Sequence, residues 1–191
     1  MKRIRVLQRT TIYRGQIIRL IRERLELEGH RFIRETVLHP GAVVVIPLMD
    51  HSRMLFVRQY RRAIRRFLLE LPAGTLAPGE RLMECAKREL EEETGWRARH
   101  LRRVAQFYAA PGFISERLTV FLAWGLTKTL AHPEADEFVT PIILSLDDAL
   151  KKVDAGAICD AKSIIGVLLT RRWLQMGRLP GRPQRRRQKR A

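Results

Sequence analysis

The chain has 191 residues, of which 46% are hydrophobic and 30% are charged. This length suits one packed domain with terminal extensions, and the composition is typical of a soluble globular protein. The longest apolar runs are far shorter than the roughly 20 residues that a transmembrane helix needs. The basic N-terminus is not followed by the continuous apolar segment of a signal peptide. We therefore expect a cytoplasmic protein without a membrane span.

The formal net charge is +17, and residues 178–190 hold seven basic side chains with no acidic one among them. A positive surplus of this size attracts nucleotides and other anions, and it also favours loose contact with RNA or DNA. Cys85 and Cys159 lie far apart, without a Cys-x-x-Cys motif or a Cys/His cluster around either. This pattern argues against a zinc site and against a disulfide framework.

The first 38 residues predict extended structure. Apolar and charged residues alternate between Ile17 and Leu27, and the Gly29-His30 pair predicts a turn into a second strand over Phe32–Leu38. We expect an N-terminal antiparallel β hairpin or small sheet over residues 1–38. His39-Pro40-Gly41 then marks the start of the main domain.

Residues 39–176 predict one domain that mixes strands and helices. Strands are expected at Ala42–Leu48, Met54–Tyr60, Leu68–Ala73, Leu101–Ala109, Leu118–Gly125 and Phe138–Leu144. Helices are expected at Glu80–Thr94 with Gly95 as a C-terminal cap, from a Ser145 cap to Val153, and from Asp160 to Met176. The high Pro, Gly and Arg content of residues 177–191 leaves nothing to bury and predicts a disordered tail.

Three glutamates carry the most informative chemistry. Glu89, Glu92 and Glu93 share one face of the expected helix, where their like charges repel. A bound divalent cation would convert this repulsion into coordination, and hard oxygen ligands suit Mg²⁺ or Mn²⁺. Arg88 can pair with Glu84 and Glu92 and fix part of the array. Taken alone, Glu-x-x-Glu-Glu is more often a solvated acidic helix face.

The residues around these glutamates favour the metal site. The chain carries Gly74, Glu80, Arg88-Glu89-Leu90, Glu92-Glu93 and Gly95 followed by an apolar residue, with the spacing G-x5-E-x7-REL-x-EE-x-G. This pattern resembles the signature of the Nudix hydrolase family at every specified position, although Trp96 is bulkier than the usual aliphatic residue. The resemblance implies an α/β/α sandwich with a mixed β-sheet and a Mg²⁺-dependent pyrophosphohydrolase.

The resemblance also implies roles for individual residues. Glu89 and Glu93, with the carbonyl of Ala73, would ligate Mg²⁺, while Glu92 would ligate or orient a water and Arg88 would belong to the same catalytic set. Cations would neutralise a diphosphate and lower the pKa of the attacking water.

Further similarity, over about residues 37–169, is to the ADP-ribose pyrophosphatase branch of the family. The matching pieces are His39-Pro40-Gly41-Ala42, Val57-Arg58-Gln59-Tyr60-Arg61, Glu70-Leu71-Pro72-Ala73-Gly74, Ala110-Pro111-Gly112-Phe113, Ser115-Glu116 and Asp160-Ala161-Lys162. Together they favour hydrolysis of ADP-ribose to AMP and ribose 5-phosphate. GDP-mannose or another nucleotide sugar is the nearer alternative, because recognition of base and sugar lies outside the glutamate motif.

In that branch an acidic loop after the motif supplies a further metal ligand and, in some members, the general base. Here the loop reads Pro133-Glu134-Ala135-Asp136-Glu137, with Ala135 where the first glutamate of the usual pair is expected. Glu137 is therefore the candidate ligand. The candidates for the base are Glu134, Glu92 and Glu116.

Five residues are candidates for substrate binding. Arg58 and Arg61 can clamp phosphate oxygens, although either can equally be surface charge. Tyr60 and Phe113 can stack on adenine, although core packing is the safer role for each ring. Gly112, next to Phe113, belongs to the same set.

The resemblance implies a homodimer, because members of the family typically extend N-terminal strands across to a partner. Residues 1–38 would form this contact, although the edge hairpin of a monomer would give the same pattern. A more distant alternative is a nucleic-acid partner, either as an RNA 5′-end pyrophosphohydrolase or as a binding module. The basic tail is the only support for that alternative. Attraction to phosphates carries no sequence information, so the tail does not identify a nucleic-acid target.

Overall fold

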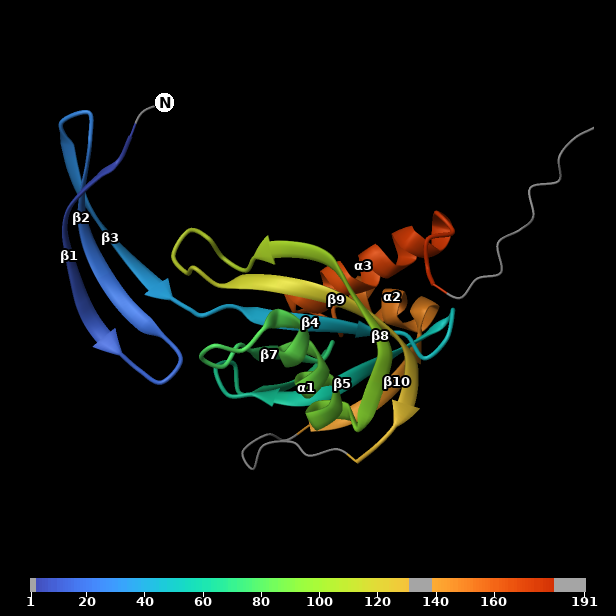
Figure 1. Cartoon of the computed structure of the whole chain (residues 1–191). Coiled ribbons are helices and arrows are strands. Elements are labelled where there is room, and N and C mark those ends of the chain that lie inside the picture. Colours follow the sequence, from blue (N-terminus) through green and yellow to red (C-terminus); the bar gives the residue numbers. More distant parts are fainter. Residues whose placement is uncertain (1–2, 131–138, 181–191) are drawn as a thin grey trace, which may run out of the picture.

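The computed structural model describes residues 3–130 and 139–180 (Figure 1). In chain order the elements are β1 (Arg5–Arg14), β2 (Arg19–Leu27), β3 (His30–Leu38), β4 (Ala42–Pro47), β5 (Arg53–Arg61), β6 (Arg66–Glu70), β7 (Ala73–Thr75), α1 (Leu82–Thr94), β8 (Trp96–Tyr108), β9 (Arg117–Lys128), β10 (Val139–Ser145), α2 (Leu146–Asp154) and α3 (Ala161–Gln175). In this part of the chain no helix is both long and apolar enough to span a lipid bilayer.

Strand β4 forms the centre of the domain, because every one of its residues is buried. It pairs antiparallel with β7 and parallel with β9, and β8 completes the mixed sheet in the order β7-β4-β9-β8. Val44 and Ile46 pack into a cluster with residues of α2 and α3, whereas Val43 and Val45 pack against α1. Since neighbouring strand residues point to opposite faces, this strand holds helices on both sides. The result is the predicted α/β/α sandwich (Figure 1).

A second sheet, ordered β10-β5-β6, is antiparallel throughout. The prediction of a single strand over Leu68–Ala73 was wrong, because the chain leaves this sheet after Glu70 and enters the first sheet at Ala73. Pro72 lies at the crossing, where it has no N–H to offer a strand partner. Its carbonyl accepts a hydrogen bond from the N–H of Val45 at 2.8 Å. Glu70 and Ala73 therefore lie in different sheets, although only two residues separate them in sequence.

The helix boundaries follow their capping residues. The side chain of Ser145 accepts a hydrogen bond from the first turn of α2, as predicted, and the side chain of Asp160 accepts one from the first turn of α3. Helix α1 ends at Gly95 in the left-handed conformation, also as predicted. It begins at Leu82 rather than at Glu80, and the Glu80 side chain bonds to other residues instead.

Part of the segment expected to belong to a disordered tail is packed on the domain. Leu179 is only 4% exposed and packs into the core cluster beside α2 and α3, and the N–H of Arg178 donates to the carbonyl of Trp173 at 2.9 Å. The expectation of disorder from residue 177 was therefore wrong for this leucine, which is a single apolar residue in a polar context. Residues 181–191 lie outside the described part of the chain.

The N-terminal region forms the predicted small antiparallel sheet, in the order β1-β2-β3. Figure 1 shows this sheet extending to one side of the main domain. Every residue of β1 is exposed. The end of β3 joins the domain through Val37, whose N–H donates to the carbonyl of Phe113 and whose carbonyl accepts from the N–H of Ser115.

Candidate active site

Two carboxylates of α1, those of Glu89 and Glu93, face the domain and not open solvent. Glu89 is 6% exposed and Glu93 is 2% exposed, whereas the side chain of Glu92 is 31% exposed at the rim of the same helix face. The Oε2 atom of Glu93 accepts a hydrogen bond of 3.1 Å from the N–H of Ala73 at the start of β7. The structure therefore brings together Ala73 and the glutamates that sequence analysis assigned to one site.

Gly74 is required by the approach of helix α1 to strand β7. A Cβ atom at this position would lie 1.8 Å from the carboxyl carbon of Glu89 and 1.8 Å from its Oε1 atom. No side chain fits at such a distance, so the carboxylate of Glu89 occupies the space that a Cβ atom would need. Glycine is therefore favoured at this position of β7 by the close approach of Glu89.

Arg88 neutralises the acidic cluster from its outer side. Its Nη1 atom lies 2.8 Å from Glu89 Oε1 and 2.9 Å from Glu92 Oε2. Its Nε atom donates to Glu80 Oε1 at 2.8 Å. The predicted pair with Glu92 is confirmed, but the predicted pair with Glu84 is wrong. Glu84 instead pairs with an arginine one turn earlier on the exposed side of the helix.

Glu80 connects the loop before α1 to the helix. Its Oε2 atom accepts a hydrogen bond from the N–H of Ala77 at 3.0 Å and one from Arg88 at 3.1 Å. The hydrogen bonds from Arg88 outweigh burial and lower the pKa of Glu80 to about 2. Glu80 is therefore ionised at neutral pH and fixes Arg88 in place.

Cys85, on α1, packs against strand β7. The side chain is fully buried, and its Sγ atom lies 3.9 Å from the carbonyl oxygen of Gly74 and 3.7 Å from that of Thr75. Burial raises the pKa of this thiol to about 12. The residue packs as a small apolar group and supports the backbone that carries Gly74.

A second group of charged side chains lies next to the first. Glu70, at the end of β6, is 1% exposed and forms ion pairs with Arg61 and Lys162. Arg61 Nη2 lies 2.5 Å from Glu70 Oε2, and Lys162 Nζ also lies 2.8 Å from Asp160 Oδ1. The network joins strands β5 and β6 to the first turn of α3.

The network and the glutamates of α1 influence each other electrostatically. Burial opposes the charged form of Arg61, but its hydrogen bonds to Glu70 and the negative charge of Glu93 outweigh burial and raise its pKa. Burial also opposes the charged form of Glu70, and alone it would raise the pKa of this carboxyl group. The hydrogen bonds from Arg61 and the charge of Lys162 outweigh this effect and hold the pKa below its ordinary value.

The structure separates two arginines that the sequence grouped together. Arg61 contacts Glu70, whereas the guanidinium of Arg58 lies 4.4 Å from the centre of the Phe67 ring. Tyr60 also packs on Phe67, with 5.3 Å between the ring centres. The two arginines therefore make contact with different neighbours on β6. Their roles in substrate binding, and that of Tyr60, stay predictions.

Three further predicted residues lie in the connection between β8 and β9. Phe113 is 59% exposed, and its carbonyl is hydrogen-bonded to β3. Gly112 precedes it in the same exposed turn. Glu116 Oε1 lies 3.8 Å from Nδ1 of His39, so this carboxylate faces the junction between the N-terminal sheet and the domain.

A hollow of about 500 Å³ borders the Gly74 loop. It is lined by Gln16, Ile17, Pro40, Thr75, Leu76, Ala77 and Pro78. Its walls therefore come from the turn between β1 and β2 and from the segment between β7 and α1. A volume of this size is within the range of small-molecule sites.

Comparison with known proteins identifies the family. The family model of the NUDIX domain matches residues 38–165. The chain belongs to the Nudix family. The match covers the mixed sheet, α1, α2 and the loop with Gly74.

Curated relatives agree with this assignment. The chain is 40% identical over 159 residues to an ADP-ribose pyrophosphatase of Bacillus subtilis, covering 82% of this chain and 86% of the relative. It is 35% identical over 163 residues to an ADP-ribose pyrophosphatase of Mycobacterium tuberculosis, covering 83% and 78%. It is also 38% identical over 159 residues to a methanol dehydrogenase activator of Bacillus methanolicus, covering 82% and 86%. The chain is thus an enzyme of the Nudix pyrophosphohydrolase type.

A solved structure shows the same fold. The crystal structure of an ADP compounds hydrolase superimposes with a TM-score of 0.81, covering 92% of this chain and 97% of that chain at 24% identity. The superposition thus extends beyond the residues that the family model matches.

The carboxylate oxygens of the Nudix motif are ligands that suit a hard divalent cation. Glu89 and Glu93 place oxygen atoms beside the backbone of Ala73 and Gly74, at a position where a Cβ atom is excluded. Within residues 3–130 and 139–180, no group of three or more His, Cys, Asp or Glu side chains is already arranged around a common metal position. The predicted ligand Glu137 and the predicted base Glu134 lie outside these residues.

Glu70 and Lys162 were not expected at the site, although both lie in segments similar to the ADP-ribose pyrophosphatase branch. One signal was present in the sequence, since Glu70 ends an apolar strand immediately before Leu71-Pro72. An acidic residue at a buried strand end requires cationic partners. The partner Lys162 is 92 residues away and could be identified only from the structure.

We predict that Gly74→Ala forces the Glu89 carboxylate out of position, because the added methyl group overlaps it. A displacement of about 1 Å at a catalytic group costs on the order of 100-fold in rate. Steady-state kinetics would measure kcat/KM, and thermal unfolding would measure stability. The matched double variant Gly74→Ala/Glu89→Ala lacks the overlapping carboxylate. It should therefore unfold at a higher temperature than Gly74→Ala, but it should remain inactive. Wild-type kcat/KM in the single variant would contradict the steric role of Gly74.

We predict that Glu70→Gln lowers the free energy of unfolding by about 3–5 kcal/mol at pH 7, because Arg61 and Lys162 lose a buried partner. The folded pKa of Glu70 is lower than its unfolded value. The stabilisation is therefore present above the unfolded pKa and is lost as the pH falls through the folded pKa. Urea unfolding at pH 7, 5 and 3 should show the two proteins converging in acid. Glu84→Gln, at an exposed ion pair, is the control, and a pH-independent difference would contradict the ionic role.

Proposed function

We propose that this chain hydrolyses the pyrophosphate bond of ADP-ribose, releasing AMP and ribose 5-phosphate, in a Mg²⁺-dependent reaction in the cytoplasm. The observation that carries the proposal is the buried carboxylate pair Glu89 and Glu93, held against the backbone of Ala73 and Gly74. The choice of substrate is supported by the two relatives named ADP-ribose pyrophosphatase, at 40% and 35% identity.

Glu89, Glu93 and the carbonyl of Ala73 would hold Mg²⁺, with Glu137 as a further ligand and Mn²⁺ as a possible replacement. The ion supplies neutralisation of the diphosphate charge and a lower pKa for the attacking water. The protein contributes the fixed position of the oxygen ligands. Arg88 and the N–H of Ala73 fix the first two carboxylates through hydrogen bonds and ion pairs, so little reorganisation is needed when charge develops.

In the reaction, the oxygen of one water forms a bond to one of the two phosphorus atoms, and the bridging P–O bond breaks. The proton released by the water passes to a protein base. We propose Glu92 as this base, because its carboxylate lies at the partly exposed rim of the site, and Arg88 holds one of its oxygens at 2.9 Å. Glu116 and Glu134 are the alternatives.

Several groups are proposed to bind the remainder of the substrate. Arg61 is within electrostatic range of Glu93 and is proposed to contact a phosphate oxygen. The hollow beside Thr75 and Pro78 is proposed to accept an uncharged part of the nucleotide sugar, because its lining contains no charged side chain. Arg58, Tyr60, Gly112 and Phe113 stay in the proposed set.

We predict that Glu93→Gln lowers kcat for AMP release by about 10²–10³-fold, because a neutral amide cannot neutralise the cation. AMP would be quantified chromatographically from ADP-ribose with Mg²⁺, with Mn²⁺ and with a chelator. Glu91→Gln is the matched control, since Glu91 lies on the same helix but pairs with the exposed Arg97. Full activity in Glu93→Gln would remove the metal role from this residue.

The same assay separates the alternatives for base and substrate. Among Glu92→Gln, Glu116→Gln and Glu134→Gln, the variant that lowers kcat most with little change in KM identifies the base. A panel of ADP-ribose, GDP-mannose and other nucleotide sugars, compared by kcat/KM, identifies the preferred substrate. A preference for GDP-mannose would replace the proposed substrate while leaving the proposed chemistry intact.

We also propose that the N-terminal sheet forms a homodimer contact. Large apolar side chains remain exposed on this sheet and its turn: Ile4, Val6, Leu7, Ile12, Tyr13, Ile17, Ile18 and Ile33. An isolated three-stranded sheet with this much exposed apolar surface gains stability by burying it. Residues 1–38 would thus be the dimerisation region, residues 39–176 the Nudix domain, and residues 177–191 the tail, with Leu179 packed on the domain.

We predict that Val6→Asp/Ile12→Asp converts the dimer into a monomer, because two charges would be buried in an apolar contact. Light scattering after size-exclusion chromatography would give the mass. Leu168→Asp, at a half-exposed residue of α3, is the control and should leave the mass unchanged. A wild-type protein that is monomeric at micromolar concentration would contradict this proposal but would not affect the hydrolase proposal.

A further inference from the structure

The ribbon formed by β8 and β9 carries an unbalanced positive charge. These two antiparallel strands contain Arg97, Arg99, Arg102, Arg103, Arg117 and Lys128, and neither strand contains an acidic residue. In the N-terminal sheet, by contrast, arginines of β1 pair with glutamates of β2, Arg5 with Glu26 and Arg9 with Glu23. The ribbon is therefore a local concentration of cations within a basic protein, and it is separate from the C-terminal tail.

Acidic neighbours do not balance these cations. Of the six, Arg97 forms an ion pair with Glu91, at 2.7 Å. Within the described residues, the structure shows no ion pair for Arg99, Arg102 or Arg103, and all three side chains are exposed. Unpaired like charges on one strand repel each other, and an anionic partner would relieve this repulsion.

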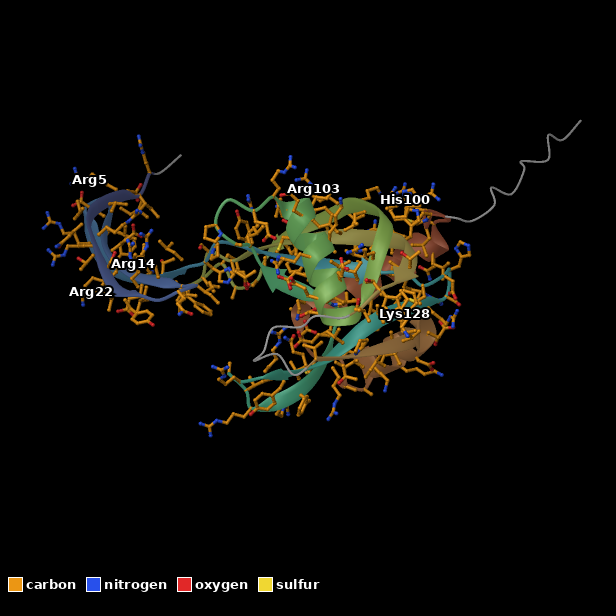
Figure 2. All side chains as sticks on the ribbon, turned by 60° about the horizontal axis from the view of Figure 1, so that its bottom comes forward. Arg5, Arg14, Arg22, His100, Arg103 and Lys128 are labelled. Atoms are coloured by element: carbon orange, nitrogen blue, oxygen red, sulfur yellow. The ribbon has the colours of Figure 1, made fainter. Side chains whose placement is uncertain are left out.

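The ribbon presents these cations along an accessible edge. β8 is the outer strand of the order β7-β4-β9-β8, so one side of its backbone has no strand partner. Arg102 lies opposite Leu122, which packs on the α2 and α3 side, whereas Arg103 lies opposite Phe121, which packs on the α1 side. The arginines therefore project on both sides of the edge. Figure 2 shows Arg103 and His100 on the periphery of the domain.

Flat side chains accompany the cations. The rings of His100 and Trp124 are stacked, with 5.1 Å between their centres and 22° between their planes. The guanidinium of Arg102 lies 5.9 Å from the centre of the Trp124 ring. His100 is exposed, so its side chain is accessible to a further planar group. Aromatic rings and guanidinium planes are the groups on which unpaired bases stack.

A simpler explanation is protection of the edge, because charged side chains prevent an outer strand from pairing with another sheet. That function is served by charges of either sign. It does not account for the complete absence of acids from both strands, or for the stacked rings at the centre of the ribbon. Both features are expected of a surface that binds a polyanion with bases.

We propose that the β8–β9 ribbon binds single-stranded nucleic acid. Arg99, Arg102 and Arg103 contact successive backbone phosphates, and a base stacks on His100. Binding is sequence-tolerant and salt-dependent, because it relies on phosphates and stacking. The residues involved are distinct from Glu89 and Glu93, so the surface is independent of the hydrolytic site and of the proposed substrate.

The experiment measures the anisotropy of fluorescent oligouridylate and oligodeoxythymidylate with the full-length protein at several salt concentrations. The edge variant is Arg99→Gln/Arg102→Gln/Arg103→Gln. The control variant is Arg14→Gln/Arg22→Gln/Arg24→Gln, which loses the same charge from the N-terminal sheet, where Arg14 and Arg22 lie far from the ribbon in Figure 2. Hydrolysis of ADP-ribose is measured for both variants as a check of the fold.

The edge variant should raise the Kd for both oligonucleotides at least about tenfold at low salt. It should also reduce the slope of log K against log salt by about two, since each phosphate contact contributes about 0.7 for a single strand. His100→Ala should weaken binding without changing the slope. Equal effects of the edge and control variants, or binding to heparin as tight as to the oligonucleotides, would overturn the proposal. Absence of binding by the wild type would also overturn it. A difference between the Kd for oligouridylate and the Kd for oligodeoxythymidylate would show whether the ribbon prefers RNA or DNA.

Discussion

The structure depends on holding several carboxylates close together inside a packed domain. Glu89 and Glu93 are nearly removed from water, and such a placement is costly unless cations and N–H groups compensate the charge. Arg88 compensates it from the outside and the N–H of Ala73 from the inside. Gly74 then sets the distance between helix and strand. The arrangement of the candidate site therefore follows from how α1 lies on β7.

The same electrostatic requirement extends beyond the Nudix motif. Glu70 sits at the point where the chain passes from the second sheet to the first, and its two cationic partners come from β5 and α3. These contacts fix the second sheet and the last helix relative to the strand that carries Ala73. The charges at and beside the carboxylates thus come from four elements, β5, β6, α1 and α3, of which the recognisable motif covers only α1.

Much of this arrangement could be predicted from sequence, because local patterns determine it. Gly95, Ser145 and Asp160 mark helix ends by their backbone and side-chain chemistry, and the spacing of Glu89 and Glu93 fixes their common face. The break between β6 and β7 was missed, because an apolar run does not reveal a change of sheet. Contacts between distant residues were also missed. The pair of Glu70 and Lys162, and the anchoring of Leu179, depend on tertiary packing that no local pattern encodes.

The different environments of the two cysteines have a practical consequence. Cys85 is sealed beneath the Gly74 loop with a strongly raised pKa, whereas Cys159 is exposed immediately before the Asp160 cap of α3. Thiolate is the reactive form, so an electrophilic dye would couple to Cys159 and leave Cys85 untouched. The native chain therefore offers a single attachment point for a fluorophore, three residues from Lys162. Such a label would report on motions of the helix start during turnover without any engineered cysteine.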